Sequence, residues 1–306
     1  MARGVAPWLL ARRLLEWLGE DVPYRDEAAA LLGLDRVCGE LRLVARSPGV
    51  AACTAELAEA LRILGLDAEA PVAPGEWFQE GAVLLLLRGP GDLLSLLERT
   101  LIDVVAYASG VATRTREMVE LARSVNPSIV VAATRKTWPG FRLCAKLAFE
   151  AGGGDTHRWG LSDAVIVKDT HAELLGGLEA ALERLRTRRG SRYRLVEVEA
   201  STPEAALEAA RAGADAVLLD NMSPAEVARA VRLLEAAGLR GRVLVEASGG
   251  VTPGNIQDYA ATGVDVVSTS YPFKNPVAVD VSAEARPLQG GCPASGRLGL
   301  LAPEHG

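Results

Sequence analysis

The sequence predicts an α/β protein in which an incomplete (β/α) barrel follows an N-terminal α+β domain. Three observations carry this prediction. From about residue 128 onward, short β-branched runs alternate with Ala/Leu/Glu/Arg-rich segments of helical period. Several helical segments begin at a Ser-Pro or Thr-Pro step, which suits a helix N-terminus. Glycines stand where the helices should end.

The predicted strands of the barrel are apolar throughout. They cover residues 129–133, 164–167, 195–198, 216–219, 243–245 and 264–267. Predicted helices lie between them, at residues 142–151, 172–186, 203–212, 224–237 and 252–262. Apolar strands joined by helices indicate a parallel sheet covered on both faces. Six such units favour an incomplete barrel, with a doubly wound open sheet as the alternative.

Residues 1–108 predict a separate α+β domain. Strand-like runs at 41–45 and 83–87 flank a helical segment at 54–64. A long helical stretch at 93–122, broken near Ser109-Gly110, leads into the barrel, which we assign to residues 109–274. Residues 275–306 form a C-terminal tail, with a return to the N-terminal domain as one option.

Composition and charge exclude several classes of protein. The chain has 306 residues and a net charge of -6, which argues against nucleic acid as a partner. No apolar run reaches the roughly 20 residues that span a membrane. The apolar N-terminal stretch is interrupted by Arg12-Arg13, so it predicts an amphipathic helix and not a signal peptide.

The four cysteines lie far apart in the sequence, at Cys38, Cys53, Cys144 and Cys292. No pair has metal-ligand spacing. We therefore expect buried or incidental thiols in a cytoplasmic protein.

Lysine and histidine are scarce and clustered. The chain has only four lysines among its 33 basic residues, and three histidines. Most of them fall between residues 134 and 171: Lys136, Lys146, Lys168, His157 and His171. In a chain that uses arginine for most of its basic residues, the few lysines indicate positions that need a compact ammonium group. The cluster predicts a site for a small, strongly anionic substrate.

Polar residues follow every predicted barrel strand. They are Thr134-Arg135-Lys136-Thr137, Lys168-Asp169, Glu199, Asp220-Asn221, Glu246-Ala247-Ser248-Gly249-Gly250 and Ser268-Thr269-Ser270. In a barrel these positions converge on the rim that carries active sites. Polar residues also mark where any buried strand meets solvent, but six in succession favour a site.

Two glycine-rich segments add anion-binding chemistry. Gly152-Gly153-Gly154 precedes His157-Arg158, which offers a hydrogen-bonding ring and a bidentate fork for a carboxylate. Ser248-Gly249-Gly250 leads into a predicted helix and suits a phosphate. The alternatives are a flexible loop for the first and a plain βα turn for the second.

Three further charged residues have open interpretations. Glu199 and Asp220 suit Mg²⁺ beside phosphate groups, or stabilise positive charge developing on a sugar carbon, or form salt bridges with neighbouring arginines. Arg99, on the helical stretch before the barrel, is by default a surface arginine.

Together these motifs resemble the quinolinate phosphoribosyltransferases, the carboxylating nicotinate-nucleotide pyrophosphorylases, over about residues 21–280. The segments that carry the resemblance are Glu98-Arg99-Thr100, Ser109-Gly110-Val111-Ala112-Thr113, Thr134-Arg135-Lys136-Thr137, Gly152-Gly153-Gly154 with His157-Arg158, Lys168-Asp169 with His171, Leu218-Leu219-Asp220-Asn221-Met222, and Glu246-Ala247-Ser248-Gly249-Gly250-Val251-Thr252. The resemblance implies an N-terminal open-sandwich domain, and a homodimer with a shared active site or a higher oligomer. It also implies that quinolinate reacts with phosphoribosyl pyrophosphate and Mg²⁺ to give nicotinate mononucleotide, pyrophosphate and CO2.

The resemblance also implies a role for each site residue. Those expected to grip the quinolinate carboxylates are Arg135, His157, Arg158 and Lys168, with Arg99 reaching in from the partner subunit. The catalytic residues serving phosphoribosyl pyrophosphate are Lys136, Glu199 and Asp220, of which Glu199 and Asp220 hold the metal. The residues expected to bind the 5′-phosphate are Ser248, Gly249 and Gly250.

The sequence departs from the family in places. Ser268-Thr269-Ser270 stands where the family usually has a glycine, and residues 24–28 replace its Gly-Asp-Leu-Thr element. Residues 21–24, 107–110 and 269–272 look more like a sister group, the pyrophosphorylases linked to molybdenum transport. The alternatives are therefore an enzyme for another small aromatic acid such as nicotinate, or a non-catalytic ligand-binding homologue. Retention of the whole charged rim argues against the last.

Overall fold

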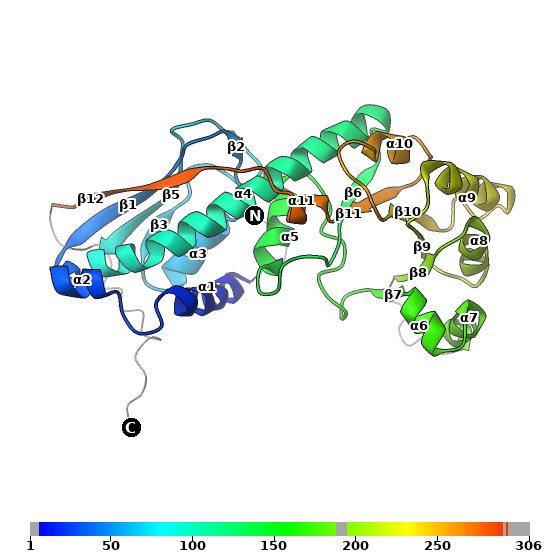
Figure 1. Cartoon of the computed structure of the whole chain (residues 1–306), viewed down its shortest axis with the longest axis horizontal. Helices are drawn as coiled ribbons and strands as arrows, with labels where there is room; N and C mark the ends of the chain where they lie inside the picture. Colours follow the sequence, from blue (N-terminus) through cyan, green and yellow to red (C-terminus); the bar gives the residue numbers. More distant parts are fainter. Residues whose placement is uncertain (1–5, 188–194, 290–291, 293–306) are drawn as a thin grey trace, which may run out of the picture. The chain divides into compact units, whose positions relative to one another are not determined.

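A computed structural model describes residues 6–187, 195–289 and 292 of the chain (Figure 1). The chain divides into two compact units. Unit 1 comprises residues 1–114, 138–153 and 275–306, and unit 2 comprises residues 115–137 and 154–274.

Unit 1 is built on a four-stranded antiparallel sheet with the order β12-β1-β5-β3 (Figure 1). Its strands are β1 (Cys38–Ala45), β3 (Asp67–Glu69), β5 (Val83–Pro90) and β12 (Val281–Pro287). A separate pair joins β2 (Gly49–Val50) to β4 (Trp77–Phe78). Leu41 and Leu43 of β1 are buried, as are Leu85 and Leu87 of β5. These leucines form the core under the sheet.

Strand β12 comes from residues 275–306, which were assigned from the sequence as a C-terminal tail. It pairs with β1 along its whole length, from Ala45↔Val281 to Gly39↔Pro287. This pairing brings the chain back to the start of β1, where Cys38 and Cys292 form a disulfide with a Cα–Cα distance of 5.4 Å. The expectation of four incidental thiols was therefore wrong for this pair. Cys53 and Cys144 are free and buried, as expected.

The helices of unit 1 include one long helix that contributes residues to both units. They are α1 (Pro7–Asp21), α2 (Glu27–Leu32), α3 (Thr54–Ile63), α4 (Gly91–Val125), α5 (Arg142–Ala151) and the short 3-10 turn η1 (Leu34–Arg36). The amphipathic first helix is confirmed, because Leu10, Leu14 and Leu18 are buried at intervals of four residues.

The predicted break in the long helix at Ser109-Gly110 was wrong, because α4 is continuous. Gly110 serves close packing instead. A Cβ on Gly110 would lie 2.2 Å from the carbonyl oxygen of Val277. The Val277 N–H donates to the Gly110 carbonyl at 3.1 Å. The glycine therefore lets another stretch of backbone touch the helix.

Unit 2 is built on a six-stranded sheet in the order β6-β11-β10-β9-β8-β7, and every pairing is parallel. Its strands are β6 (Val130–Ala133), β7 (Val165–Val167), β8 (Val196–Ala200), β9 (Ala216–Asp220), β10 (Leu244–Ser248) and β11 (Val266–Thr269). From β7 to β11 each strand lies beside the next one in sequence. A doubly wound sheet reverses its order in the middle, so this sheet is the predicted incomplete barrel.

Helices follow the strands of unit 2 and cover the sheet (Figure 1). They are α6 (Asp169–Leu174), α7 (Leu178–Thr187), α8 (Pro203–Arg211), α9 (Pro224–Ala236) and α10 (Ile256–Ala260), and a short α11 (Tyr271–Lys274) follows β11. Thr202 and Ser223 cap α8 and α9 through their side chains, directly before a proline. Among the described residues of both units, no helix is long and apolar enough to cross a bilayer.

Two predicted helices differ from those observed. The predicted helix at 172–186 is two helices, because Gly176 and Gly177 both adopt positive φ. The predicted helix at 252–262 shrinks to the five residues of α10. Ser248-Gly249-Gly250 therefore does not run directly into a helix, and its own backbone N–H groups remain the anion donors to consider.

Candidate active site

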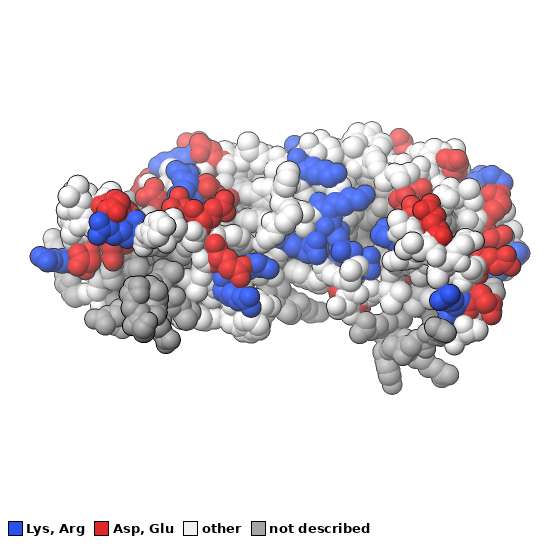
Figure 2. All heavy atoms as spheres, turned by 60° about the horizontal axis from the view of Figure 1, so that its bottom comes forward, with Lys and Arg blue, Asp and Glu red and all other residues white. Residues whose placement is uncertain are grey.

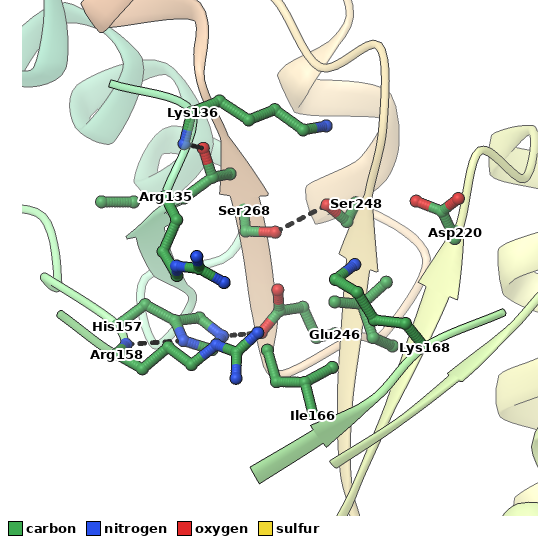
Figure 3. A pocket seen from close by; sticks show the side chains of 13 residues that line it. Arg135, Lys136, His157, Arg158, Ile166, Lys168, Asp220, Glu246, Ser248 and Ser268 are labelled. Atoms are coloured by element: carbon green, nitrogen blue, oxygen red, sulfur yellow. Dashed lines mark hydrogen bonds and ion pairs between the residues drawn. The ribbon is translucent and has the colours of Figure 1, made fainter. Parts of the chain in front are cut away.

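The carboxyl ends of the parallel strands in unit 2 surround a cavity of about 310 Å³ (Figure 3). It is lined by Ala133, Thr134, Arg135, Lys136, His157, Arg158, Ile166, Lys168, Leu218, Asp220, Glu246, Ser248 and Ser268. The polar residues come from β6, β7, β9, β10 and β11 or from the loops that follow the strands, as expected for the active rim of a barrel.

Basic side chains enter this cavity from two sides: Arg135 and Arg158 lie together, and Lys168 lies across from them, nearer Asp220 (Figure 3). Arg135 follows β6, Lys168 follows β7, and Arg158 stands on the loop before β7 (Figure 3). Arg158 is only 7% exposed, and burial, together with the nearby Arg135, lowers its pKa. Figure 2 shows a face of the protein on which Lys and Arg side chains gather into a patch. Concentrated positive charge in a partly dehydrated cavity favours a compact anion with more than one negative charge.

Beneath the basic side chains lies a pair of buried carboxyl groups. Glu197 on β8 and Glu246 on β10 are 2% and 4% exposed. His157 Nε2 is 3.0 Å from Glu246 Oε2 and 3.6 Å from Glu197 Oε2. Burial and the neighbouring Glu246 raise the pKa of Glu197 to about 9. Two buried carboxyl groups this close cannot both ionise, so the pair holds one proton at neutral pH.

A second group of carboxylates lies on the Lys168 side of the cavity. Glu199 on β8 accepts a hydrogen bond from Lys168 Nζ at 2.5 Å. Asp220 ends β9 and accepts from Asn221 Nδ2 at 2.6 Å. Both line an adjoining cavity of about 220 Å³ with Asp169 and Glu173. Apart from the Ser201 hydroxyl, its polar side chains are carboxylates, whose oxygens are the ligands that Mg²⁺ prefers.

The glycine loop after β10 packs tightly against the end of β9. Gly249 and Gly250 adopt φ values of 98° and 65°. A Cβ on Gly249 would lie 2.3 Å from Asn221 Oδ1, so only glycine fits at this position. The Asn221 N–H donates to the Ser248 carbonyl at 2.8 Å. The loop is thus held in one shape beside Asp220.

The segment Ser268-Thr269-Ser270, which stands where the family usually has a glycine, contacts this loop through its first two side chains. Ser268 lines the cavity, and its hydroxyl donates to Ser248 Oγ at 2.9 Å (Figure 3). Thr269 Oγ1 donates to the Val251 carbonyl at 2.9 Å. Both side chains tie β11 to the glycine loop, so the departure is accommodated inside the site.

Most of the predicted site residues come together here. Those that line the main cavity are Arg135, Lys136, His157, Arg158, Lys168, Asp220 and Ser248. Glu199 lines the adjoining cavity, and Gly249 and Gly250 follow Ser248. Arg99 does not belong to this group within the chain: it lies on α4 in unit 1, 3.3 Å from Asp103 Oδ1. There it lines a groove of about 840 Å³.

Sequence reasoning did not assign a role to Glu197, Glu246, Ile166 or Ser268. Glu197 had a usable signal, because it stands two residues before Glu199 and therefore on the same face of β8. Glu246 and Ser268 were visible as polar residues at the ends of β10 and β11. Their partners, His157 and Ser248, are distant in sequence and could not be paired without the fold.

Six parallel strands that present basic side chains, paired carboxylates and a glycine loop at one rim define an α/β-barrel site for a small phosphorylated or carboxylated molecule. The chain belongs to the quinolinate phosphoribosyl transferase family. The profile of that family's C-terminal domain matches residues 111–284, and that of its N-terminal domain matches residues 26–109.

Several relatives share most of the chain. A probable nicotinate-nucleotide pyrophosphorylase [carboxylating] of Archaeoglobus fulgidus is 46% identical over 208 residues, which is 68% of this chain and 79% of the relative. The Homo sapiens nicotinate-nucleotide pyrophosphorylase [carboxylating] is 36% identical over 90% of this chain and 91% of the relative. A protein of Rhodobacter capsulatus named "Putative pyrophosphorylase ModD" is also 36% identical, over 79% of this chain and 92% of the relative.

A solved structure shows the same fold. The crystal structure of NadC from Streptococcus pyogenes superposes with a TM-score of 0.82 at 28% sequence identity. The superposition covers 94% of this chain and all of that one.

Proposed function

We propose that this chain transfers the phosphoribosyl group of phosphoribosyl pyrophosphate to the ring nitrogen of quinolinate. The transfer releases pyrophosphate, and loss of one carboxyl group as CO2, with a proton taking its place on the ring carbon, then gives nicotinate mononucleotide, a step of NAD biosynthesis. The observation that carries the proposal is the cavity in unit 2, where basic side chains for a dicarboxylate lie beside carboxylates and a glycine loop suited to a sugar phosphate.

The acid is bound among the basic side chains of the cavity. Quinolinate carries two adjacent carboxylates, so its binding needs several cations within a few ångströms. Arg135, Arg158 and Lys168 supply them. Guanidinium groups bind carboxylates through paired hydrogen bonds, which also fixes the plane of the pyridine ring. When the pyridine ring is fixed in this plane, its nitrogen faces the sugar carbon.

The sugar phosphate is bound beside the acid. The backbone of Ser248-Gly249-Gly250 receives the 5′-phosphate, and Lys136 faces the pyrophosphate that leaves. Glu199 and Asp220 would hold Mg²⁺, for which their all-oxygen donor set is suited. Bound Mg²⁺ supplies charge neutralisation for the pyrophosphate. The same carboxylates stabilise positive charge as it develops on the sugar carbon.

We further propose a cytoplasmic homodimer. Both proposed substrates are highly charged metabolites that do not cross membranes unaided. Arg99 lies in a groove of unit 1 whose side chains include Trp17, Trp138 and Tyr107. Aromatic residues and arginine are common at protein interfaces. We assign this groove to the partner subunit, whose site Arg99 would complete.

The experiment is a product assay with purified protein, quinolinate, phosphoribosyl pyrophosphate and Mg²⁺. We expect equal amounts of nicotinate mononucleotide, pyrophosphate and CO2. Omission of Mg²⁺, by adding EDTA, should reduce the rate by at least tenfold. Absence of nicotinate mononucleotide above background would refute the function.

Two variants separate an enzyme from a binding protein with the same fold. Lys136→Ala and Glu199→Ala should lose at least about a hundredfold in turnover, because each removes a group that acts on developing charge. Glu235→Gln, an exposed change on α9, is the matched control and should keep wild-type turnover. Turnover unchanged in the first two variants would contradict the assigned roles.

A second candidate is another small aromatic acid such as nicotinate, because the chain is also similar to the Rhodobacter capsulatus putative pyrophosphorylase, whose name specifies no acid. Nicotinate lacks the second carboxylate, so it should bind more weakly to three cations than quinolinate does. Competition between the two acids, measured by calorimetry, decides this. Tighter binding of nicotinate would favour the second candidate.

A further inference from the structure

The loop that carries His157 spans the open side of the sheet in unit 2. The sheet order places β6 and β7 at opposite ends. Asp155 forms a parallel bridge with Ala132 of β6, in which the Ala133 N–H donates to the Asp155 carbonyl at 2.8 Å. Arg158 Nη1 donates to the Ala164 carbonyl, directly before β7, at 3.2 Å. The loop between Asp155 and Arg158 therefore contacts both edges of the incomplete barrel.

His157 forms the middle of this loop and is held from several directions. Its backbone has a φ of 50°, an unusual value for a residue other than glycine. Its own N–H donates to Asp155 Oδ1 at 2.6 Å. Its ring reaches Glu246 on β10, the third strand from the β6 edge (Figure 3). The ring thus connects the loop to the interior of the sheet.

The two ring nitrogens of His157 have fixed and different roles. The Arg158 N–H donates to Nδ1 at 2.8 Å, so Nδ1 is an acceptor and carries no proton. The single proton of the neutral ring is then on Nε2, which donates to Glu246 Oε2 at 3.0 Å. Both nitrogens are therefore used within the protein.

This tautomer argues against metal binding by His157, Glu197 and Glu246, although their ligand-type atoms lie within 4.8 Å of one another. A histidine that binds a metal through Nε2 keeps its proton on Nδ1 and donates it to an acceptor. Here a backbone N–H already points at Nδ1. The arrangement of donors is the reverse of a metal site.

We propose that His157 is a positioning residue: it locks the loop so that the Arg158 guanidinium faces the acid substrate, and it does not bind that substrate itself. The identity of the acid rests on the proposed function, but the locked ring does not. Arg135, Arg158 and Lys168 then hold both substrate carboxylates. This role differs from the direct carboxylate contact that the family resemblance implies for His157.

The first test is nitrogen NMR of the wild-type protein with ¹⁵N-labelled histidine. The chain has only three histidines, so comparison with a His157→Gln spectrum assigns the signal. We expect a neutral ring with the proton on Nε2, both in the free protein and after saturation with quinolinate. A proton on Nδ1, or a doubly protonated ring in either state, would overturn the proposal. The free-protein spectrum reads the tautomer even if quinolinate is not a substrate.

The second test separates the two hydrogen bonds of the ring by substitution. In His157→Asn the side-chain oxygen can replace Nδ1 as acceptor for the Arg158 N–H. In His157→Gln the amide can replace Nε2 as donor to Glu246. In His157→Phe both bonds are lost but the ring volume stays. We expect the Phe variant to bind quinolinate about tenfold more weakly and the Asn and Gln variants to lie between it and the wild type.

The ratio of quinolinate to nicotinate affinity distinguishes positioning from contact. A positioning role weakens both acids by the same factor, since Arg158 binds a carboxylate that both possess. A contact between His157 and the second carboxylate of quinolinate would lower quinolinate affinity alone, and that result would overturn the proposal. If the Phe variant does not fold, the Asn and Gln variants and the wild-type spectrum decide the matter.

Discussion

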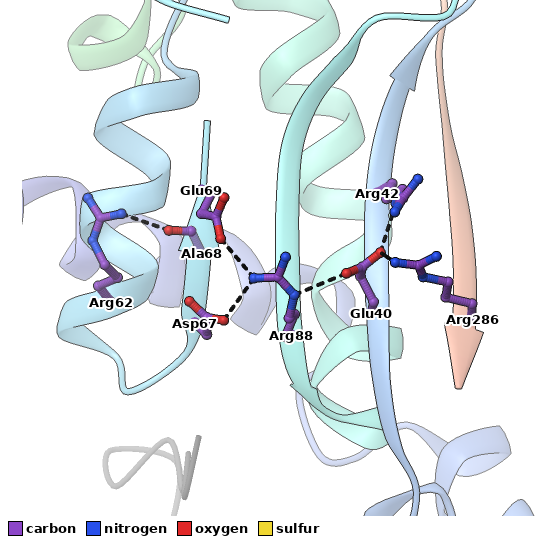
Figure 4. Close-up of polar contacts among 8 residues, drawn as sticks. All are labelled: Glu40, Arg42, Arg62, Asp67, Ala68, Glu69, Arg88 and Arg286. Atoms are coloured by element: carbon purple, nitrogen blue, oxygen red, sulfur yellow. Dashed lines mark hydrogen bonds and ion pairs between the residues drawn. The ribbon is translucent and has the colours of Figure 1, made fainter. Parts of the chain in front are cut away.

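Each unit of this protein buries a glutamate almost completely, and the two glutamates have opposite surroundings. Glu40 on β1 of unit 1 and Glu197 on β8 of unit 2 are each 2% exposed. Glu40 is contacted by three arginines, Arg42, Arg88 and Arg286, at 2.7–3.0 Å (Figure 4). Glu197 instead faces a second carboxyl group, Glu246, and the ring of His157.

The pKa values of the two carboxyls shift in opposite directions. Burial alone raises the pKa of each. For Glu40, hydrogen bonds from Arg42 and Arg88 outweigh burial, so its pKa is lowered. For Glu197, the neighbouring Glu246 adds to burial, so its pKa is raised to about 9. The same side chain at the same exposure is a structural ion in one unit and a proton holder beside the candidate site in the other.

The arginines around Glu40 extend into a network across the whole antiparallel sheet. Arg88 on β5 also contacts Asp67 and Glu69 of β3, at 3.0 and 2.8 Å (Figure 4). Glu40 therefore stands at the centre of ion pairs that join β12, β1, β5 and β3. We infer that this network stabilises the sheet, whereas the carboxyl pair in unit 2 serves the cavity above it.

The largest effect should come from Glu40→Ala. The substitution leaves three arginines without their shared acceptor and should lower the free energy of unfolding by about 3 kcal/mol. Urea denaturation at neutral pH measures the change. Glu284→Ala is the control, because its pair with Arg46 is exposed and should contribute less than about 1 kcal/mol. Equal losses in the two variants would show that the network is no more than a set of surface pairs.

In contrast to Glu40→Ala, the Gly249→Ala variant should weaken ligand binding and change the stability of unit 1 little. A methyl group at this position would meet Asn221, and the φ of 98° disfavours any other residue. The cost of about 2 kcal/mol should weaken the binding of phosphoribosyl pyrophosphate roughly thirtyfold. Calorimetry provides the measurement, with Gly241→Ala as a control at a glycine with open space around it. Unchanged affinity would remove the glycine loop from the phosphate site.

The pH dependence of stability should differ in sign for the two glutamates. The folded protein keeps a proton on Glu197 between its ordinary pKa of 4.5 and about 9, and the unfolded chain does not. The contribution of Glu197 to the free energy of unfolding is therefore fully present below pH 4.5 and is lost as the pH rises to about 9. Glu40 behaves oppositely, because its lowered pKa makes its contribution disappear as pH falls.

Melting temperatures between about pH 2 and pH 10 test this smaller effect, and we expect shifts of a few degrees. Glu197→Gln should flatten the alkaline side of the profile, and Glu40→Gln should flatten the acid side. A Glu197→Gln profile parallel to the wild type would show that the pair titrates normally.

The sequence was sufficient to find most of unit 2 because its signals are local. Each strand of the barrel is a short apolar run, and each is followed by the residues that line the cavity, such as Arg135, Lys168 and Asp220. Parallel strands place these ends at one rim without further information.

What failed in prediction depended on contacts distant in sequence. Gly110 looked like a helix break because the approach of Val277 cannot be read from either segment. Glu197 looked like part of a strand, since only folding brings Glu246 beside it. Strand β12 has a weak sequence pattern and is ordered by its pairing with β1. In each case the missing information was a tertiary neighbour.

The disulfide between Cys38 and Cys292 turns most of the chain into a covalent ring. Every described residue of unit 2 lies inside this ring, as does most of unit 1. A single peptide-bond cleavage anywhere between the two cysteines would open the ring without separating it into two molecules. The cut protein would keep its mass on a non-reducing gel and split only after a thiol is added. Proteolysis could thus map exposed loops while both fragments remain attached to one another.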